Sequence, residues 1–177
     1  MSNILIIDIE TTDFQARNGK IVEVGIVDLN LNTGERKIIF DKVCHERPIT
    51  REHVEKSWIV NNSDLTVQDI QRSPQLLHLQ YEIQDILYNY PLGATAFNNA
   101  FDFGFLESRG FIFPKKLACP MLLARKIIDN RKNPSVETCH KFLFGDVGYI
   151  EKHRGADDAY FEAEIVYELY KRGIFKI

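Results

Sequence analysis

The hydrophobic pattern of the chain is strongest at its start, where an almost wholly aliphatic run from residue 3 ends in acids and hydroxyls over residues 8–13. Continuous Ile and Leu without polar alternation is typical of a strand covered on both faces of a sheet. Side chains two apart on a strand share a face, so Asp8 and Glu10 should point the same way. Two such carboxylates need a cation, a shared proton or open water. Acids at exposed strand ends are also common, so this spacing alone leaves a metal site open.

Shorter patterns predict the other elements. Apolar residues recur over 21–29 and 37–43 around turn residues 30–34, which predicts a three-stranded antiparallel meander with the first strand. A further strand is expected over 92–97. Helices are expected over 50–56, 74–90, 98–106, 121–128, 136–144 and 154–172, with a break at 61–63. The order of elements predicts an α/β fold, in which a mixed sheet with parallel strands beside the meander is flanked by helices.

Composition narrows the class of protein. The 177 residues, 45% hydrophobic and 27% charged, suit a single domain over residues 1–177 with an ordinary globular core. Neither a membrane-spanning run nor a signal-peptide pattern is present, so we expect no membrane association and a cytoplasmic location. Cys44, Cys119 and Cys139 are odd in number and widely spaced, which favours reduced thiols over zinc ligands. A net charge of -3 gives no global attraction to nucleic acid.

Three downstream residues are candidates to complete an acidic site. Asp102 lies amid phenylalanines where a strand gives way to a helix, and Asp158 lies in the first turns of the last helix. Each is either a favourable helix-terminus charge or a ligand. His153 precedes Asp158 by five residues, with Gly155 allowing a bend between them. A histidine on such a loop can reach over a group bound by the helical acid, which suits a base beside a metal. The other histidines, His45, His53, His78 and His140, fit surface or core positions.

In combination, three segments resemble the exonuclease motifs of the DEDDh family, whose fold is ribonuclease-H-like and which includes the proofreading subunit of bacterial replicative DNA polymerase. They are Asp8-Ile9-Glu10-Thr11-Thr12, the Asn98 to Leu106 segment around Asp102, and the segment from His153 to Ala159. Similarity extends between the motifs, through the strand from Ile21 and the segment from Cys119 to Arg125, and covers nearly the whole chain.

The resemblance implies a 3′→5′ exonuclease that releases nucleoside 5′-monophosphates. Asp8, Glu10, Asp102 and Asp158 would hold two divalent ions, Mg²⁺ or Mn²⁺, and His153 would act as general base. Nucleic-acid 3′ ends would be the partner, DNA in preference to RNA, and the family allows for a polymerase or repair protein as well. The residues expected to contact substrate are Thr11, Thr12, Phe14, Trp58 and Asn98.

Three departures from the family pattern bear on substrate choice. The second motif lacks the usual His before its Asn and has Phe97 there, Asp13 replaces a glycine, and Ser57-Trp58-Ile59 stands where the family often has His-Gly-Ile. Phe14, Trp58 and Phe97 are each either base-stacking surfaces or packing residues.

Two alternatives stay open at this point. The same chemistry could act on RNA or oligoribonucleotides, because local contacts decide recognition of the 2′-hydroxyl. A non-catalytic nucleic-acid-end binding or polymerase accessory module is the competing class, and retention of all four acids and the histidine argues against it. The sequence leaves the oligomeric state undetermined. Lysines and arginines at 115–116, 125–126, 152 and 154 are candidates for a local basic border.

Overall fold

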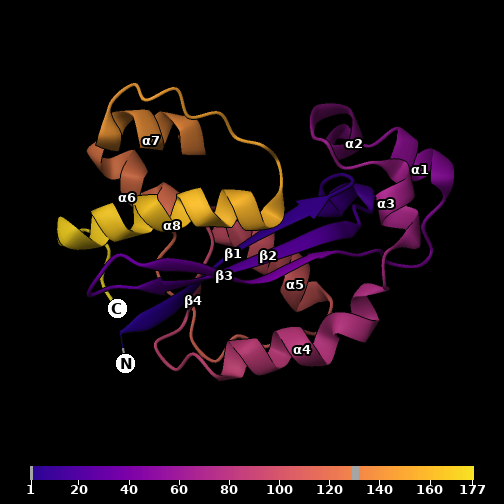
Figure 1. Cartoon of the computed structure of the whole chain (residues 1–177), viewed down its shortest axis with the longest axis horizontal. Coiled ribbons are helices and arrows are strands. Elements are labelled where there is room, and N and C mark those ends of the chain that lie inside the picture. Colours follow the sequence, from indigo (N-terminus) through magenta and orange to yellow (C-terminus); the bar gives the residue numbers. More distant parts are fainter. Residues whose placement is uncertain (1, 129–131) are drawn as a thin grey trace.

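The computed structural model describes residues 2–128 and 132–177 (Figure 1). Within these residues a four-stranded mixed sheet has the order β3-β2-β1-β4. The strands are β1 (Asn3–Thr11), β2 (Ile21–Asn30), β3 (Arg36–Val43) and β4 (Ala94–Thr95). Strands β1, β2 and β3 form an antiparallel meander, and β4 lies parallel to β1. The predicted meander and the predicted α/β class are confirmed.

Strand β4 is shorter than the predicted strand over 92–97. Gly93 has a φ of 107° just before the strand. After Thr95 the backbone leaves the sheet, because the Ala96 N–H donates to the side-chain oxygen of Asn99 at 2.8 Å instead of to a neighbouring strand. The strand prediction was therefore right in place and too long at both ends.

Helices cover both faces of the sheet. Their bounds are α1 (Arg51–Glu55), α2 (Trp58–Asn62), α3 (Val67–Arg72), α4 (Leu76–Tyr88), α5 (Asn99–Ser108), α6 (Pro120–Ile127), α7 (Val136–Phe144) and α8 (Gly155–Lys171), with a 3-10 turn, η1 (Gln15–Arg17). All six predicted helices are confirmed within a few residues. In the described part of the chain, no helix has the length and apolar character needed to cross a membrane.

Two short helices, α2 and α3, were not predicted. The break expected at 61–63 was wrong for Asn61 and Asn62, which lie in the last turn of α2. Their side-chain amides donate to the carbonyls of Ser57 and Trp58, four residues earlier, at 2.8 and 2.7 Å. Helix α3 begins with a capping box between Thr66 and Asp69.

Strand β1 is central in the fold because its two faces belong to different cores. Ile4 and Ile6 pack with α6, α7 and α8, whereas Leu5 and Ile7 pack with α4 and α5. Figure 1 shows α8 crossing one face of the sheet and α4 lying along the other. The alternation places Asp8, like the other even-numbered residues of β1, on the α8 side.

The start of α8 lies directly on the backbone of the sheet. A Cβ atom built on Gly25 would come within 2.1 Å of the Gly155 carbonyl carbon, so neither residue tolerates a larger side chain. Gly25 is paired with Asp8 across the β1–β2 ladder. The close approach therefore brings the first turn of α8 to the acidic end of β1.

Candidate active site

The acids of β1 meet a third acid from α5. Asp8 and Glu10 are half-buried and share one face of the strand. The Asp102 side chain is 3% exposed, and its Oδ1 accepts a hydrogen bond from the backbone N–H of Ile9 at 3.3 Å. Asp102 is in the first turn of α5. This bond fixes the Asp102 carboxylate beside the β1 segment that separates the other two acids.

The fourth acid, Asp158, organises the loop before α8. Its side chain is 2% exposed, and its two oxygens accept backbone N–H groups from Lys152 at 3.2 Å and Arg154 at 2.9 Å. The residue between those donors is His153, which adopts a left-handed backbone with a φ of 56°. The five-residue spacing thus closes a loop in which Asp158 holds the backbone on both sides of His153.

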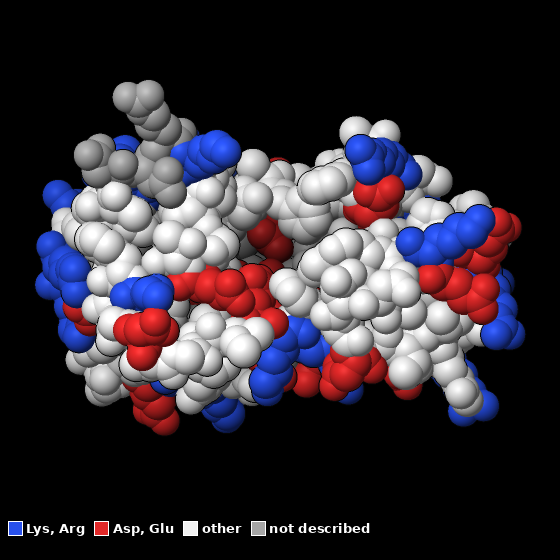
Figure 2. Space-filling view, turned by 90° about the horizontal axis from the view of Figure 1, so that it is seen from above, with Lys and Arg blue, Asp and Glu red and all other residues white. Residues whose placement is uncertain are grey.

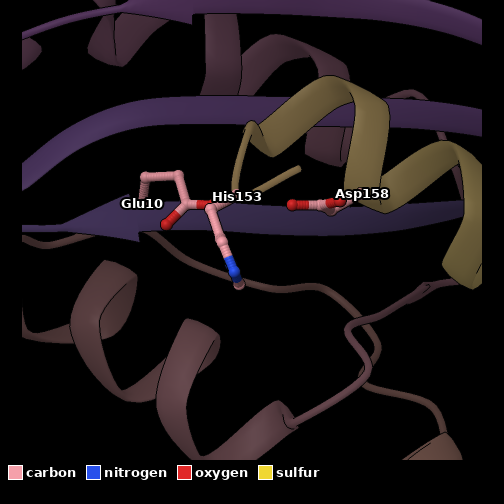
Figure 3. A group of neighbouring side chains, drawn as sticks. All are labelled: Glu10, His153 and Asp158. Carbon is pink, nitrogen blue, oxygen red and sulfur yellow. The ribbon is translucent and has the colours of Figure 1, made fainter. Parts of the chain in front are cut away.

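Glu10, His153 and Asp158 come together from three parts of the chain. One ligand atom from each lies within 4.8 Å of the other two. In Figure 3, Glu10 extends from β1, Asp158 from the start of α8, and His153 from the loop before it. Figure 2 shows acidic side chains in a hollow between the α1–α3 side and the α6–α8 side, while lysines and arginines lie mostly away from it.

Burial raises the pKa of each of the four acids, and repulsion by neighbouring carboxylates adds to the effect for Asp8, Glu10 and Asp158. Burial raises the pKa of Glu10 to about 9, with Asp158 and Glu23 adding to the effect, and raises that of Asp102 to about 7. The pKa of Asp8 is well above its usual range, through burial and then through repulsion by Glu162. Burial also raises the pKa of Asp158, although the two backbone N–H groups oppose the shift. The carboxylates of the site repel one another when ionised, and a bound cation would reduce this repulsion.

An ion pair anchors the histidine loop to the sheet. The guanidinium of Arg154 donates to both oxygens of the fully buried Glu23, at 2.8 to 3.1 Å, and also bonds Asp64 at 2.7 Å. Glu23 is the β2 partner of Glu10 in the ladder. Arg154 therefore forms ion pairs with two acids of the protein, and its place in a basic border stays a prediction. Lys152 is likewise paired, with Asp157, at 3.2 Å.

Two aromatic side chains near the site are exposed. Trp58, 55% exposed, meets the His153 ring with centroids 4.6 Å apart and an interplanar angle of 80°. Phe14, 62% exposed, contacts Phe101 edge to face at 6.3 Å. Phe97 is buried in the core beneath α8, which favours packing over base stacking for that residue.

The remaining candidate residues lie close to the ends of β1 and α5. The Thr11 hydroxyl donates to the Asp13 carbonyl at 3.0 Å. The Thr12 hydroxyl, which is buried, accepts from Lys20 N–H and lies 2.7 Å from His53 Nε2. His53 thus belongs to the surroundings of the site, a role that its isolated position in the sequence did not suggest.

Asn98 precedes α5 and lines a cavity of about 500 Å³ between α5 and α6. Its carbonyl accepts from the N–H groups of Phe101 and Asp102, at 2.8 and 3.2 Å. Asn98 therefore helps to orient the first turn of α5, which carries Asp102.

Three further acids surround the site and escaped sequence reasoning. Glu23 is buried in β2, Glu162 is buried in α8, and burial raises the pKa of Glu151 to about 7. The sequence pattern could have identified Glu162, because this acid interrupts a stripe of small and aliphatic residues on α8 that ends in Leu169.

The fold and the site together define a class, the DEDDh-type exonucleases of ribonuclease-H-like fold. A family model described as Exonuclease matches residues 5–166, a span that includes all four acids and His153. The chain belongs to this Exonuclease family, and its members are hydrolytic nucleases.

The chain is also similar to a known DNA polymerase. A DNA polymerase III PolC-type from Clostridium perfringens (strain 13 / Type A) is 28% identical over 173 residues, which cover 95% of the chain and 11% of the polymerase. The chain thus spans about a tenth of this curated relative.

Two solved structures share the fold. The nuclease domain of 3′hExo, a DEDDh family member bound to rAMP, has a TM-score of 0.69 at 17% identity and covers 99% of this chain and 96% of that one. Exonuclease X in complex with 5′ overhanging duplex DNA has a TM-score of 0.57 at 24% identity and covers 96% and 93%.

Proposed function

We propose that the chain is a metal-dependent 3′→5′ exonuclease, formed as one domain over residues 1–177, that releases nucleoside 5′-monophosphates. The observation that carries this proposal is the close grouping of four acids, Asp8, Glu10, Asp102 and Asp158, with His153, from β1, α5, the start of α8 and the loop before it. A non-catalytic end-binding module would have no use for a base held beside four crowded acids.

The donor set fits two divalent cations. Carboxylate oxygens are the ligands that Mg²⁺ and Mn²⁺ prefer, and the raised pKa values of Glu10 and Asp102 indicate carboxylates without enough positive charge nearby. Two such ions would supply positive charge to the attacking and leaving oxygens of an in-line displacement at phosphorus. Asp8, Glu10, Asp102 and Asp158 are the residues that would hold them.

His153 is positioned to take the proton of the attacking water. Imidazole titrates near neutral pH and can accept that proton and return it to solvent. The hydrogen bonds from Lys152 and Arg154 to Asp158 fix the backbone around His153, and its ring rests against Trp58. The ring is thus held at the edge of the acid group.

The proposed substrate is a single-stranded or frayed DNA 3′ end. A paired terminal nucleotide must first lose its pairing and stacking, at a cost of a few kcal/mol, before its phosphate reaches a recessed site. The exposed rings of Phe14 and Trp58 offer surfaces on which freed bases could stack. Thr11, Thr12 and Asn98 would border the terminal nucleotide.

RNA is the second candidate substrate. The similarity to the DNA polymerase favours DNA, whereas the likeness to a nuclease domain bound to rAMP favours RNA. A polymerase or repair partner is also consistent with the polymerase relative. We place the protein in the cytoplasm.

The substrate is tested by digestion, with Mn²⁺, of 5′-labelled single-stranded DNA, matched blunt duplex DNA, duplex DNA with a mismatched 3′ end, and RNA of the same sequence. We expect single strands and mismatched ends to shorten faster than matched duplex at low temperature, with the gap narrowing on warming. Equal rates on single strand and matched duplex would contradict the requirement that the terminal base pair opens first. Faster digestion of RNA than of DNA would identify RNA as the preferred substrate.

A further inference from the structure

Glu162, in the second turn of α8, is a buried carboxylate that the four motif acids do not include. Its side chain is 3% exposed, and its Oε2 has no hydrogen-bond partner among the residues that the structure describes. A backbone hydrogen bond with Phe97 offsets part of the cost of burying the Glu162 carboxylate. The buried Oε2 remains unsatisfied, which is unfavourable and calls for a reason. Something outside the protein is therefore expected to complete the surroundings of Glu162.

Protein cations do not neutralise this charge. Within residues 2–128 and 132–177, no salt bridge to Glu162 is found. Glu164, two residues further along, does have basic neighbours. Its Oε2 lies 3.4 Å from Arg36 Nη1 and 3.4 Å from His140 Nε2. The side of α8 that carries Glu162 faces the sheet.

The Glu162 side chain points toward the acid group. Residues four apart on a helix lie on one face, and helical side chains tilt toward the N-terminus, so Glu162 reaches back beneath Asp158. Among carboxylates, Glu162 has the largest effect on the pKa of Asp8. The pKa of Glu162 is itself well above its usual range, through burial and then through Asp102 and Asp158. Glu162 therefore faces the inner side of the site, near Asp8 and Asp102.

We propose that Glu162 is a fifth carboxylate ligand of the metal site, at the inner position beside Asp8 and Asp102. The proposal rests on the proposed function, since it assumes that the site binds divalent cations. An additional anionic oxygen raises the affinity of a cation site, and a bound cation gives the unpartnered Oε2 its missing neighbour. Glu10 and His153 would then border the outer position.

Calorimetric titration with Mn²⁺ tests the assignment without relying on activity. Glu162→Gln keeps the size of the side chain and removes the charge, and Glu164→Gln removes the same charge from the same helix away from the site. We expect Glu162→Gln to weaken Mn²⁺ binding at least tenfold and Glu164→Gln to leave it unchanged. Mn²⁺ binding by Glu162→Gln as tight as that of the unmodified protein would overturn the proposal.

Thermal unfolding gives a second readout. In chelator, Glu162→Gln should melt higher than the unmodified protein, because a buried charge has been removed, and its melting temperature should rise less on addition of Mn²⁺. If Glu162→Gln fails to fold, Glu162→Asp replaces it in the titration. Glu162→Asp keeps the charge but withdraws the carboxylate by one methylene, so it should also weaken Mn²⁺ binding, and unchanged binding would overturn the proposal.

Measurements on the unmodified protein distinguish a failure of the proposed function from a failure of the Glu162 assignment. If it binds no Mn²⁺ and releases no nucleotides, the proposed function fails. If it binds Mn²⁺ and hydrolyses DNA while Glu162→Gln binds Mn²⁺ equally tightly, only the role of Glu162 is wrong.

Discussion

The rings of His153 and Trp58 meet edge to face, with centroids 4.6 Å apart and an interplanar angle of 80°. Contacts of this geometry between aromatic rings contribute about 0.5–1.5 kcal/mol beyond buried area. Trp58 is the first residue of α2, a helix that the sequence pattern did not predict. The indole thus supports the ring of the proposed base from an element on the opposite side of the hollow from α8.

Trp58→Ala should lower kcat up to about tenfold, because a contact of about 1 kcal/mol no longer orients His153. Mn²⁺ affinity should not change. Steady-state kinetics on single-stranded DNA separate this role from base stacking, since a lost stacking surface raises KM instead. Trp58→Phe should retain most of kcat, and Phe14→Ala, at an exposed ring not in contact with His153, serves as the control that affects KM alone. An unchanged kcat in Trp58→Ala would show that the indole does not position the base.

His153→Asn should reduce turnover roughly 10²–10⁴-fold, as expected on removal of a general base. Asparagine is preferred to alanine because it tolerates the left-handed backbone that His153 adopts, with a φ of 56°. Calorimetric Mn²⁺ affinity should be retained, since backbone groups on either side hold Asp158. If affinity falls as far as in an acid variant, His153 is a ligand.

Asp102→Asn should abolish hydrolysis and stabilise the protein in chelator. The amide oxygen can still accept from Ile9 N–H, so the variant loses the charge while keeping that hydrogen bond. Asp8→Asn, which removes another buried charge, should behave in the same way. Hydrolysis assays and melting curves in chelator check both effects. Full activity in either variant would remove that residue from the proposed metal-binding set.

The stability of the protein in chelator should decrease as the pH rises from about 5 to 9. Burial raises the pKa of Asp102 to about 7 and that of Glu10 to about 9, so the folded protein holds protons that the unfolded chain releases at lower pH. The stabilisation is complete below the ordinary carboxyl pKa and is lost as the pH passes these raised values. Mn²⁺ binding, which needs ionised acids, should add more to the melting temperature at high pH. Scanning calorimetry across this range is the measurement, and stability in chelator that rises between pH 6 and 9 would contradict the account.

Arg154→Ala should lower the free energy of unfolding by about 3–5 kcal/mol, because it leaves Glu23 buried without its partner. Asp64→Asn, which removes the exposed partner of the same arginine, should cost at most about 1 kcal/mol. Chemical denaturation of both variants provides the comparison. Equal effects would mean that burial of Glu23 does not dominate this ion pair.

Local patterns sufficed for much of the fold. The aliphatic run of β1 predicted a strand covered on both faces, and the two-residue period placed Asp8 and Glu10 on one side. Thr50 and Ser135 cap α1 and α7 as hydrogen-bond acceptors, so the starts of these helices were readable from the sequence. Local chemistry determines each of these features.

Contacts between side chains far apart in the chain could not be predicted from the sequence. Glu23 is separated from Arg154 by 131 residues, and an acid in a strand pattern gives no sign that a distant arginine will neutralise it. His53 was set aside as isolated because its neighbour Thr12 is 41 residues away. The loop around His153 depends on the donation of two backbone N–H groups to Asp158, which no residue type specifies.

Release of a labelled 3′-terminal nucleotide from single-stranded DNA tests the central claim most directly, when the unmodified protein and Asp102→Asn are compared with Mn²⁺ and with chelator. The account predicts that the unmodified protein with Mn²⁺ liberates the label as a nucleoside 5′-monophosphate, and that chelator or Asp102→Asn prevents release. Label released equally well in chelator, or first appearing in internal fragments, would contradict a metal-dependent 3′→5′ exonuclease.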